Sequence, residues 1–390
     1  MRGDYDTEVV ARLRSSLATR RHTSGLTHNF YHYPARFPPD VARAVIETFS
    51  DPGDWILDPF MGGGTAVVEG LATGRRVIGV DINALAHFVT AVRTTPLSIA
   101  DEKEILAWSV CAAEKLAASD VSWVERPQID NLPNAVETFI AGAVALSEGL
   151  GVLRRRAFAR CALLRLGQWA LDCRDFEAPR RKRLGQQLPV IVRSMLDGLR
   201  AFETACADAE VGKKEITGRR VLMHRSAIGI ETLPQIRRLG AKPRLVFTSP
   251  PYPGVHVLYH RWQYRGRKET SAPYWIASVP DGYGASFYTC GSRTPTGLRT
   301  YFTTITAAFS SVRSVIAPNA TVVQLVGFSD IATQLPLYLG AMEAAGFEEH
   351  IVADRERLCR EVPNRKWYAQ LLGAVDASYE VLLIHRPRSH

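Results

Sequence analysis

The 390-residue chain lacks the cysteine spacings of a zinc or redox site: its six cysteines are irregularly placed and none forms a CxxC pair. This favours buried, reduced thiols over a disulfide framework or a metal cluster. No apolar run approaches the roughly 20 residues that span a bilayer. The first 21 residues are charged throughout and lack the apolar segment of a secretory signal. We therefore expect a cytoplasmic protein that has no membrane partner.

Repeats and low-complexity segments are also missing, and a metal site is not indicated. His256 and His260 have helical spacing, but no glutamate stands between them and no third ligand is evident. Hydrophobic residues make up 46% of the chain and charged residues 22%, which is typical of a globular protein. The net charge of +9 favours a polyanionic partner.

The most informative stretch is Thr248–Tyr252, with the sequence TSPPY. It follows an apolar run, 244–247, that predicts a buried strand. A polar residue, two prolines and an aromatic ring then stand at the carboxyl end of that strand, where open α/β sheets place their ligands. Two adjacent prolines fix φ and leave their carbonyls free to accept hydrogen bonds. Such a rigid turn suits a planar base with an exocyclic amino group.

A second motif lies earlier in the chain. Residues 58–65, DPFMGGGT, separate a predicted strand (55–57) from a predicted helix (66–72). Three glycines in this position let the backbone approach a ligand, with the helix N-terminus behind it. A second strand, 76–80, ends in Asp81, and an acid at this position is the usual ribose-diol ligand. No Lys-Ser/Thr follows the glycines, so this is not a phosphate-binding P-loop.

These motifs resemble those of a known family. TSPPY resembles motif IV of amino-directed DNA methyltransferases, and serine in its first variable position is most similar to the cytosine-N4 branch. Residues 58–65 resemble motif I of S-adenosylmethionine (SAM)-dependent amino-methyltransferases, and residues 77–83 resemble motif II. The resemblance covers about 30–97 and 219–386. It implies an α/β class I methyltransferase (Rossmann-like) fold, with a mostly parallel seven-stranded sheet and a helical insert.

The resemblance also implies a site. SAM is the implied cofactor, and a segment around 32–39 is read as a lid over it. The implied cofactor-binding residues are Tyr33, Pro34, Phe37, Asp58, Pro59, Phe60, Gly62, Gly64, Thr65, Asp81, Ile82 and Asn83. The implied catalytic residues are Ser249, Pro250, Pro251 and Tyr252. An acid that the family often carries after the third strand is missing, because residues 224–226 read His-Arg-Ser.

The chain divides into three parts on this reading. Residues 1–97 hold an N-terminal lead-in and the SAM-binding half, 98–215 a helical insert, and 216–390 the catalytic half. Residues 151–200 carry twelve basic side chains against four acidic ones, so we predict phosphate contact by the insert. An aromatic and basic stretch, 253–296, is a second region for target recognition. The predicted DNA-binding residues are Arg180, Arg181, Lys182, Arg183, Arg261, Trp262, Arg265, Arg267 and Lys268.

The predicted reaction is methyl transfer from SAM to cytosine N4 in double-stranded DNA. Ser249 and the Pro250 carbonyl would accept the amino hydrogens, Tyr252 would stack on the base, and the base must first leave the duplex. Adenine-N6 methylation uses the same logic and stays open. So do a catalytically inactive DNA-binding relative and an RNA amino-methyltransferase. Methylation at cytosine C5 is set aside, because no cysteine follows a proline. A restriction-modification system, with a cognate restriction endonuclease as partner, is compatible with the resemblance.

Further elements are predicted from periodicity. Residues 98–215 should hold four or five helices, and a helix should span about 228–239. The C-terminal part should alternate helix and strand, and end in an antiparallel hairpin formed by strands at 348–352 and 379–385. The loop between them, 362–368, is predicted to be irregular.

Overall fold

The computed structural model describes residues 5–19, 25–32, 37–118, 120–172, 177–253, 262–265, 268–282, 290–292, 294–352, 356–362 and 378–388. At its centre is a mixed sheet with the strand order β3-β2-β1-β4-β7-β10-β8. Its parallel strands are β1 (Trp55–Asp58), β2 (Arg76–Asp81), β3 (Arg220–His224), β4 (Leu245–Thr248) and β7 (Thr321–Phe328). Strand β10 (Ser378–Pro387) runs antiparallel to β7. This arrangement confirms the predicted class I methyltransferase fold.

The predicted strand number differs from the observed one. In the described part of the chain the sheet has eight strands and not seven. Two short strands, β8 (Phe347–Glu349) and β9 (Leu358–Val362), pair with different ends of the same edge of β10. Strand β8 pairs with 385–387 and β9 with 378–382. Two strands therefore pair with β10 where the sequence predicted a single partner strand at 348–352.

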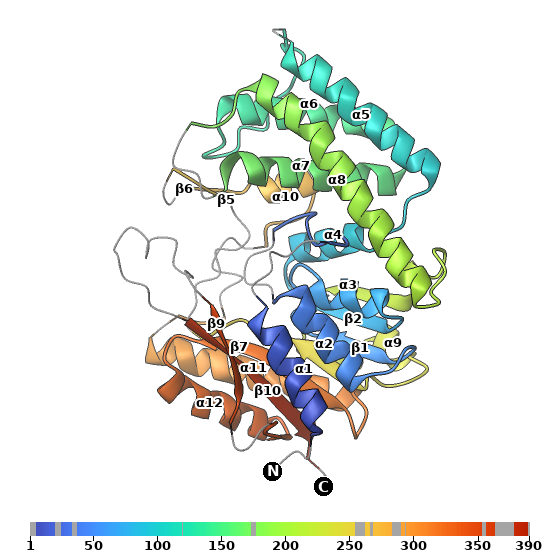
Figure 1. Ribbon diagram of the computed structural model, residues 1–390. Helices are drawn as coiled ribbons and strands as arrows, with labels where there is room; N and C mark the ends of the chain where they lie inside the picture. The colour runs from blue at the N-terminus through green and yellow to red at the C-terminus, as the bar shows by residue number, and fades with distance from the viewer. Residues whose placement is uncertain are drawn as a thin grey trace.

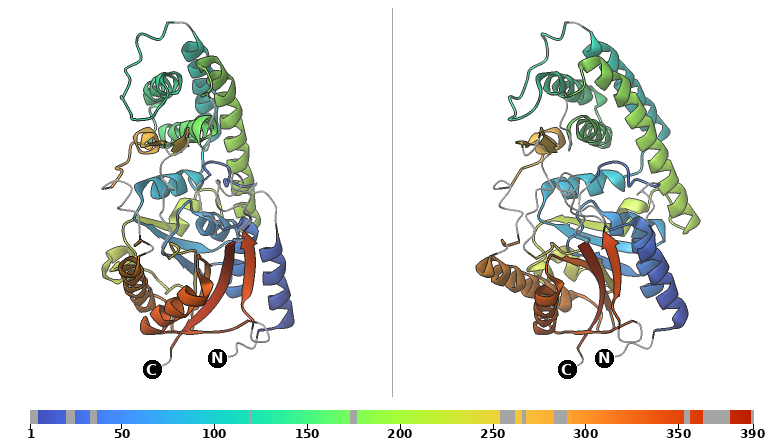
Figure 2. Two further views of the ribbon diagram at one scale, coloured as in Figure 1. Left: turned by 90° about the vertical axis from the view of Figure 1, so that its left-hand side faces the viewer. Right: turned by 60° about the vertical axis from the view of Figure 1, so that its left-hand side comes forward.

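Helices cover both faces of the sheet (Figure 2). One core cluster contains residues of α1 (Thr7–Ala18), α2 (Pro39–Phe49), α3 (Thr65–Ala72) and α4 (Ala84–Arg93). A second core cluster contains residues of α11 (Pro295–Val315) and α12 (Ile331–Ala344). Apolar side chains of the strands alternate between the two clusters: Leu325 and Leu382 belong to the first, and Val326 and Val381 to the second. The sheet is therefore a buried central layer.

Four helices lie beyond the sheet, at the top of Figure 1. They are α5 (Ile99–Ala117), α6 (Asn134–Ser147), α7 (Leu153–Leu171) and α8 (Arg181–Asp208), with a 3₁₀ turn, η1 (Glu148–Leu150), after α6. We call α5 to α8 the helical lobe. Helix α5 begins with a capping box, in which the Asp101 amide donates to Ser98 Oγ (3.2 Å) and the Ser98 amide to Asp101 Oδ2 (2.9 Å).

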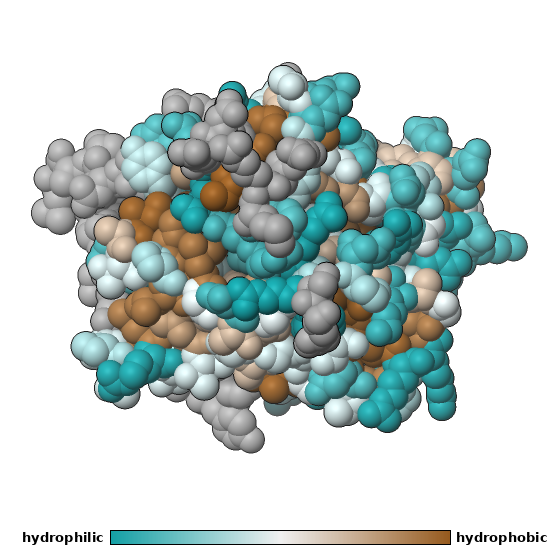
Figure 3. Space-filling model, turned by 90° about the horizontal axis from the view of Figure 1, so that it is seen from below, coloured by the Kyte–Doolittle hydropathy of each residue, from teal (hydrophilic) through white to brown (hydrophobic). Residues whose placement is uncertain are grey.

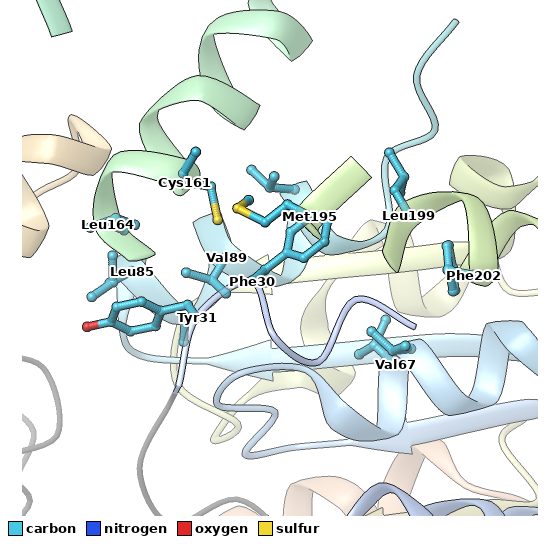
Figure 4. Packing of buried hydrophobic residues seen from close by; sticks show 14 of the residues in the cluster. Phe30, Tyr31, Val67, Leu85, Val89, Cys161, Leu164, Met195, Leu199 and Phe202 are labelled. Atoms are coloured by element: carbon cyan, nitrogen blue, oxygen red, sulfur yellow. The ribbon is translucent and has the colours of Figure 1, made fainter. Parts of the chain in front are cut away.

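The helical lobe and the sheet share one hydrophobic core. Figure 4 shows Phe30 and Tyr31 of the N-terminal segment packing with Leu85 and Val89 of α4 and with side chains of α7 and α8. All belong to the first core cluster. Continuous burial of this kind ties the lobe to the sheet as one packed unit, because separating the two would expose a shared apolar surface.

A segment that follows TSPPY in the sequence also lies against the helical lobe (Figure 1). It consists of the hairpin β5 (Trp262–Tyr264) and β6 (Lys268–Thr270) and the helix α10 (Ala272–Ala277). Trp262 packs over Gly167 of α7, where an added Cβ would lie 2.2 Å from the indole ring. The glycine is therefore needed for the ring to approach the helix. Tyr252 thus packs with the sheet, whereas Trp262 packs on the helical lobe.

One helix prediction is wrong. In place of a helix over 228–239, the structure has the 3₁₀ turn η3 (Ile230–Thr232) and the single-turn α9 (Pro234–Arg237). Pro234 has no amide hydrogen and disfavours helical backbone at the residue before it, so it begins a new turn. A further 3₁₀ turn, η2 (Ile216–Arg219), leads into β3. The predicted loop 362–368 lies outside the described residues except for Val362, which ends β9.

None of the helices in the described ranges is both long enough and apolar enough to cross a bilayer. At the end of the molecule where both termini lie, hydrophilic and hydrophobic side chains alternate over short distances (Figure 3). We assign no interaction surface to this end.

Candidate active site

The TSPPY turn follows β4, the strand that lies between β1 and β7 in the sheet. Thr248 is 0% exposed and Tyr252 is 6% exposed, whereas Ser249 is only partly buried. Ser249 therefore supplies the accessible hydroxyl group of the turn. The turn lies at the carboxyl end of a central parallel strand, as expected for a ligand site in this class of fold.

The first residue of the turn is bonded to the glycine-loop motif. Thr248 Oγ1 donates a hydrogen bond to Asp58 Oδ1 at 2.6 Å, across 190 residues of sequence. The amide of Phe60 donates to the same oxygen at 3.2 Å. Asp58 is 0% exposed, and its second oxygen has no hydrogen-bond partner among the described residues. Burial raises the pKa of Asp58 to about 7, although the Thr248 and Phe60 hydrogen bonds oppose this rise.

Two tyrosine hydroxyls bond the turn to a neighbouring helix and to a strand of the sheet. The Tyr301 hydroxyl, from α11, donates to the Pro251 carbonyl at 2.7 Å. The Tyr252 hydroxyl donates to Glu380 Oε1, on β10, at 2.7 Å. With the Thr248 bond, the turn is held from three directions in addition to the constraint that its prolines place on φ. Such preorganisation suits a site whose work is to position a base.

The stacking role that the sequence suggests for Tyr252 stays a prediction. At 6% exposure the ring belongs to the second core cluster, and its hydroxyl is turned to Glu380. Stacking on an extruded base would require a ring face to become accessible.

The glycine loop is shaped by residues of α4. Gly64 has φ +78°, and an added Cβ would lie 2.5 Å from the Thr90 side chain, so this position requires glycine. Arg93 is 0% exposed and donates to the Gly63 carbonyl. The same guanidinium donates to the carbonyls of His28 and Tyr31. Arg93 therefore joins the loop to the N-terminal segment.

Asp81 ends β2 beside this loop. Its carboxylate accepts hydrogen bonds from the amides of Gly62 and Asn83, both at 2.8 Å. Burial raises the pKa of Asp81 to about 6, and the two amide hydrogen bonds limit the rise. A carboxylate has about four acceptor positions, so Asp81 retains capacity for two hydroxyl groups of a ribose. Gly62 and Asp81, predicted from separate motifs, are brought into contact.

The other predicted cofactor residues have varied surroundings. Thr65 and Pro59 are buried at the two ends of the loop, and Phe60 and Ile82 are partly buried. Asn83 is 0% exposed: its oxygen caps α4 through the Leu85 amide (2.8 Å), and its Nδ2 donates to the Tyr274 hydroxyl (3.2 Å). Asn83 thus positions α4 against α10.

Phe37 packs against Phe247 of β4 at a ring-centroid distance of 4.5 Å and is 6% exposed. In this structure it is a core residue, not an exposed part of a lid. Tyr33 and Pro34 lie outside the described residues.

The tip of β3, where the family's acid is missing, is organised by main-chain bonds. The Arg225 amide donates to the Asp81 carbonyl at 2.8 Å, and His224 Nε2 donates to the Ile82 carbonyl at 3.1 Å. Ser226 Oγ accepts from the Ile228 amide at 3.1 Å. Because Ser226 is exposed and its hydroxyl proton remains to be donated, it is the side chain at this tip that is best suited to bind an adenine ring nitrogen.

Much of the basic surplus in the insert is neutralised within the protein. Arg154 and Arg155 bind the 0%-exposed Asp101, with closest distances of 2.6 and 2.7 Å. Arg156 and Arg160 bind Glu148. Further along the insert, Arg180, Lys182 and Arg183 are exposed, and no ion pair joins them to any described residue. Arg181 is partly buried, and its Nη1 donates to the Leu116 carbonyl at 3.2 Å.

The two basic regions predicted separately meet in space. The Ala178 amide donates to the Tyr264 hydroxyl at 3.2 Å, which brings the start of α8 beside the β5–β6 hairpin. The exposed Arg265 lies over the Tyr264 ring at 5.5 Å. Lys268 is also exposed on this hairpin, whereas Arg261 and Arg267 lie outside the described residues.

Trp262 requires a correction, because we predicted it as a DNA-contacting residue. It is 1% exposed, packs over Gly167 and donates from its indole nitrogen to the Tyr31 hydroxyl at 3.1 Å. Its role in this structure is to anchor the hairpin to the core. Its position between basic residues in the sequence did not show whether the ring is exposed or buried.

Four residues around the site were not predicted as site residues from the sequence: Arg93, Tyr274, Tyr301 and Glu380. Each comes from an element distant in sequence from the motif that it contacts. None of them carries a clear local signal; Arg93, for example, is the last residue of α4, where a basic side chain is ordinary.

Comparison with known proteins gives a match for the cofactor half of the site. A family model described as DNA methylase, from the N6/N4 methyltransferase family, matches residues 13–90. This part of the chain resembles DNA methylases. It includes the glycine loop and Asp81, but not TSPPY.

Two curated relatives match part of the chain. The Type II methyltransferase M.MvaI of Kocuria varians is 44% identical over 78 residues, which are 19% of this chain and 17% of that protein. The DNA adenine methyltransferase YhdJ of Escherichia coli strain K12 is 36% identical over 59 residues, or 15% of this chain and 20% of that protein. The chain therefore spans about a fifth of the length of these relatives.

A solved structure of the rRNA methyltransferase aviRa from Streptomyces viridochromogenes aligns over 95% of this chain and 92% of its own. Its TM-score is 0.31 and its sequence identity 10%. A likeness this distant carries no argument about function.

Proposed function

We propose that this protein is a SAM-dependent DNA methyltransferase that acts on an exocyclic amine, and that its target is cytosine N4. The observation that carries the proposal is the hydrogen bond between Thr248 and Asp58. It joins an amine-accepting turn to the glycine loop at adjacent strand ends. Ligand groups held on rigid strands can meet the alignment that methyl transfer requires.

The residues of the loop fit the cofactor. Asp58 presents a buried oxygen with no hydrogen-bond partner among the described residues, and Asp81 retains acceptor capacity. Both are carboxylates, which suits a ligand that carries an ammonium group, a sulfonium and a ribose diol. When bound, SAM supplies an electrophilic methyl group. We propose that Asp81 holds the ribose and that the glycine loop and Asp58 hold the amino-acid part.

The turn supplies acceptors for the amine. The lone pair of the cytosine N4 amine is delocalised into the base, so the amine is a weak nucleophile. Ser249 Oγ and the Pro250 carbonyl would accept its two hydrogens, which favours a more pyramidal nitrogen and stabilises the positive charge that develops on it. No strong base is needed for this step. Serine in the first position supports cytosine over adenine.

The substrate is proposed to be double-stranded DNA with the target base extruded. The exposed residues Arg180, Lys182, Arg183, Arg265 and Lys268 would contact its phosphates. They come from the helical lobe and from the hairpin that follows the catalytic turn. A cognate restriction endonuclease is a further proposal, supported by the relative named as a Type II methyltransferase.

The deciding experiment is incubation of the purified protein with SAM and unmethylated genomic DNA, followed by nucleoside mass spectrometry. We expect N4-methylcytosine. N6-methyladenine would replace the cytosine assignment with the adenine one, which the match to an adenine methyltransferase keeps open. Methylated RNA in a parallel incubation, with unmodified DNA, would overturn the DNA assignment.

Two variants test the roles within the site. Ser249→Ala should lower methyl transfer about a hundredfold or more, because it removes an acceptor present in the transition state. Its affinity for SAM, measured by calorimetry, should stay within a few-fold. Asp81→Ala should weaken SAM binding about tenfold or more. Full activity of the first variant, or unchanged affinity of the second, would remove that residue from its proposed role.

A further inference from the structure

A chain of polar groups runs from the catalytic turn into the sheet. Ser249 Oγ lies 3.4 Å from the Tyr252 hydroxyl oxygen, which lies 2.7 Å from Glu380 Oε1. Glu380 Oε2 lies 3.4 Å from Arg360 Nη1 on β9. Tyr252 and Glu380 are each 6% exposed. The Tyr252–Glu380 hydrogen bond is therefore shielded from water, and in such surroundings hydrogen bonds are electrostatically stronger.

The chemistry of these groups fixes the direction of the hydrogen bonds. A carboxylate accepts only, so the phenolic proton of Tyr252 points to Glu380. The Tyr252 oxygen is then an acceptor for the Ser249 proton, and the Ser249 oxygen keeps its lone pairs for an incoming N–H group. Without Glu380, the Tyr252 hydroxyl would lose this acceptor and could donate its proton to Ser249. The Ser249 hydroxyl would then turn its own proton toward the amine, which has only donors to offer.

We propose that Glu380 is a positioning residue for methyl transfer: acting through Tyr252, it orients the Ser249 hydroxyl as an acceptor for the target amine. This inference rests on the function proposed above. Glu380 touches neither base nor cofactor in this role. The Ser249–Tyr252 distance of 3.4 Å is long, and such bonds commonly tighten when the reacting complex forms.

A purely structural role would make different predictions. In that case the Glu380–Arg360 pair would only join β9 to β10, and its loss would lower stability without a specific effect on turnover. The two roles are separated by asking whether the effect of Glu380 on kcat depends on the Tyr252 hydroxyl.

The test is a double-mutant cycle. The variants are Tyr252→Phe, Glu380→Leu and the double variant, with Glu380→Gln as the conservative replacement. The measurements are kcat for transfer of tritiated methyl from SAM to unmethylated genomic DNA, KM for SAM, and the melting temperature. Each single variant should lower kcat on the order of tenfold to hundredfold. The double variant should be no slower than Tyr252→Phe, and KM for SAM should change little. Glu380→Gln should stay within a few-fold of wild type, because the glutamine oxygen can still accept from Tyr252.

A matched control is Glu349→Leu. Glu349 is paired with Arg357 at 2.6 and 2.8 Å and lies beside the other end of β10, opposite His385. Its loss should lower the melting temperature and leave kcat unchanged.

The inference is overturned if the Tyr252 and Glu380 effects on kcat simply multiply, or if Tyr252→Phe retains wild-type kcat. It is also overturned if the kcat of Glu380→Gln falls as far as the kcat of Glu380→Leu. If the leucine variant does not fold, the kcat of Glu380→Gln is compared with that of Tyr252→Phe, and equal losses overturn the inference in the same way. A wild-type protein that transfers no methyl group to DNA would refute the proposed function itself, and this inference with it, before any variant is compared.

Discussion

Asp58 beside the TSPPY turn and Asp101 in the helical lobe are both 0% exposed, yet their pKa values shift in opposite directions. Asp58 receives hydrogen bonds from a threonine and a backbone amide, the described part of the chain places no cation among its partners, and its pKa rises to about 7. For Asp101, burial alone would raise the pKa, but hydrogen bonds from Arg154, Arg155 and Ser98 hold it far below its usual range.

The difference matches the roles proposed for the two residues, a ligand-binding acid for Asp58 and a structural ion-pair acid for Asp101. An uncompensated acid at a ligand site is costly to the folded protein, and it can gain a partner when a cationic ligand binds. An acid clamped by two arginines has no such capacity, and it serves to join α5 to α7. The same side chain at the same degree of burial therefore has two roles, which are set by the charge of its neighbours.

The largest expected effect comes from removing the clamp. Replacing Arg154 and Arg155 by glutamine leaves a buried carboxylate without a cation and should lower the free energy of unfolding by about 3 kcal/mol. The measurement is urea denaturation at pH 7.

The pH dependence sharpens this prediction. The folded-state pKa of Asp101 is depressed, so its contribution is present above the unfolded-state pKa near 4 and is lost as the pH falls below it. The stability gap between wild type and the Arg154/Arg155 variant should therefore narrow below pH 4. A gap that is constant from pH 7 to pH 3 would show that the arginines act through packing alone.

Asp58→Asn should have the opposite effect. The folded-state pKa is raised, so wild type loses stability as the pH rises from about 4 to about 7, while the asparagine variant does not. The variant should be more stable than wild type by about 2 kcal/mol at pH 8, with little difference near pH 4. Its amide oxygen can still accept from Thr248. A variant that is less stable than wild type at pH 8 would break the contrast between the two aspartates.

A smaller effect is expected from the exposed basic residues. Replacing Arg180, Lys182 and Arg183 by glutamine should lower DNA affinity about tenfold at moderate salt and reduce the slope of log K against log salt by up to about 3. Fluorescence anisotropy at several salt concentrations measures both. Arg156→Gln is the matched control, because Arg156 is already paired with Glu148. If Arg156→Gln weakens DNA binding as much as the triple variant does, the exposed basic residues contribute no more to DNA binding than a basic residue that is paired within the protein.

The sequence is sufficient to predict the α/β fold and the location of the site's motifs. Strands that read as short apolar runs end in polar residues, and the carboxyl ends of parallel strands share one edge of the sheet. The sequence was not sufficient to predict which charged residues form ion pairs when they lie far apart in the chain. Arg154 and Arg155 read as a phosphate-binding run, while their partner Asp101 lies more than 50 residues earlier. Glu380 gives no local signal, because its importance depends on strand β10 lying beside β7.

Other misses have simpler causes. Pro234 was a visible reason to divide the helix predicted over 228–239. Trp262 could not be placed without knowing that Gly167 leaves room for its ring. The aromatic residues of 253–296 were therefore read as a surface, although at least this one belongs to the core.

The slot that Gly167 provides for Trp262 limits how this protein could be re-engineered. Exchanging residues 98–215 for the corresponding segment of a relative would appear to transplant a self-contained specificity module. Any larger residue at the position of Gly167 would collide with the indole, since a single added carbon already lies 2.2 Å from it. A chimera should therefore carry residues 262–277 together with the insert, because the two segments pack as one structural unit.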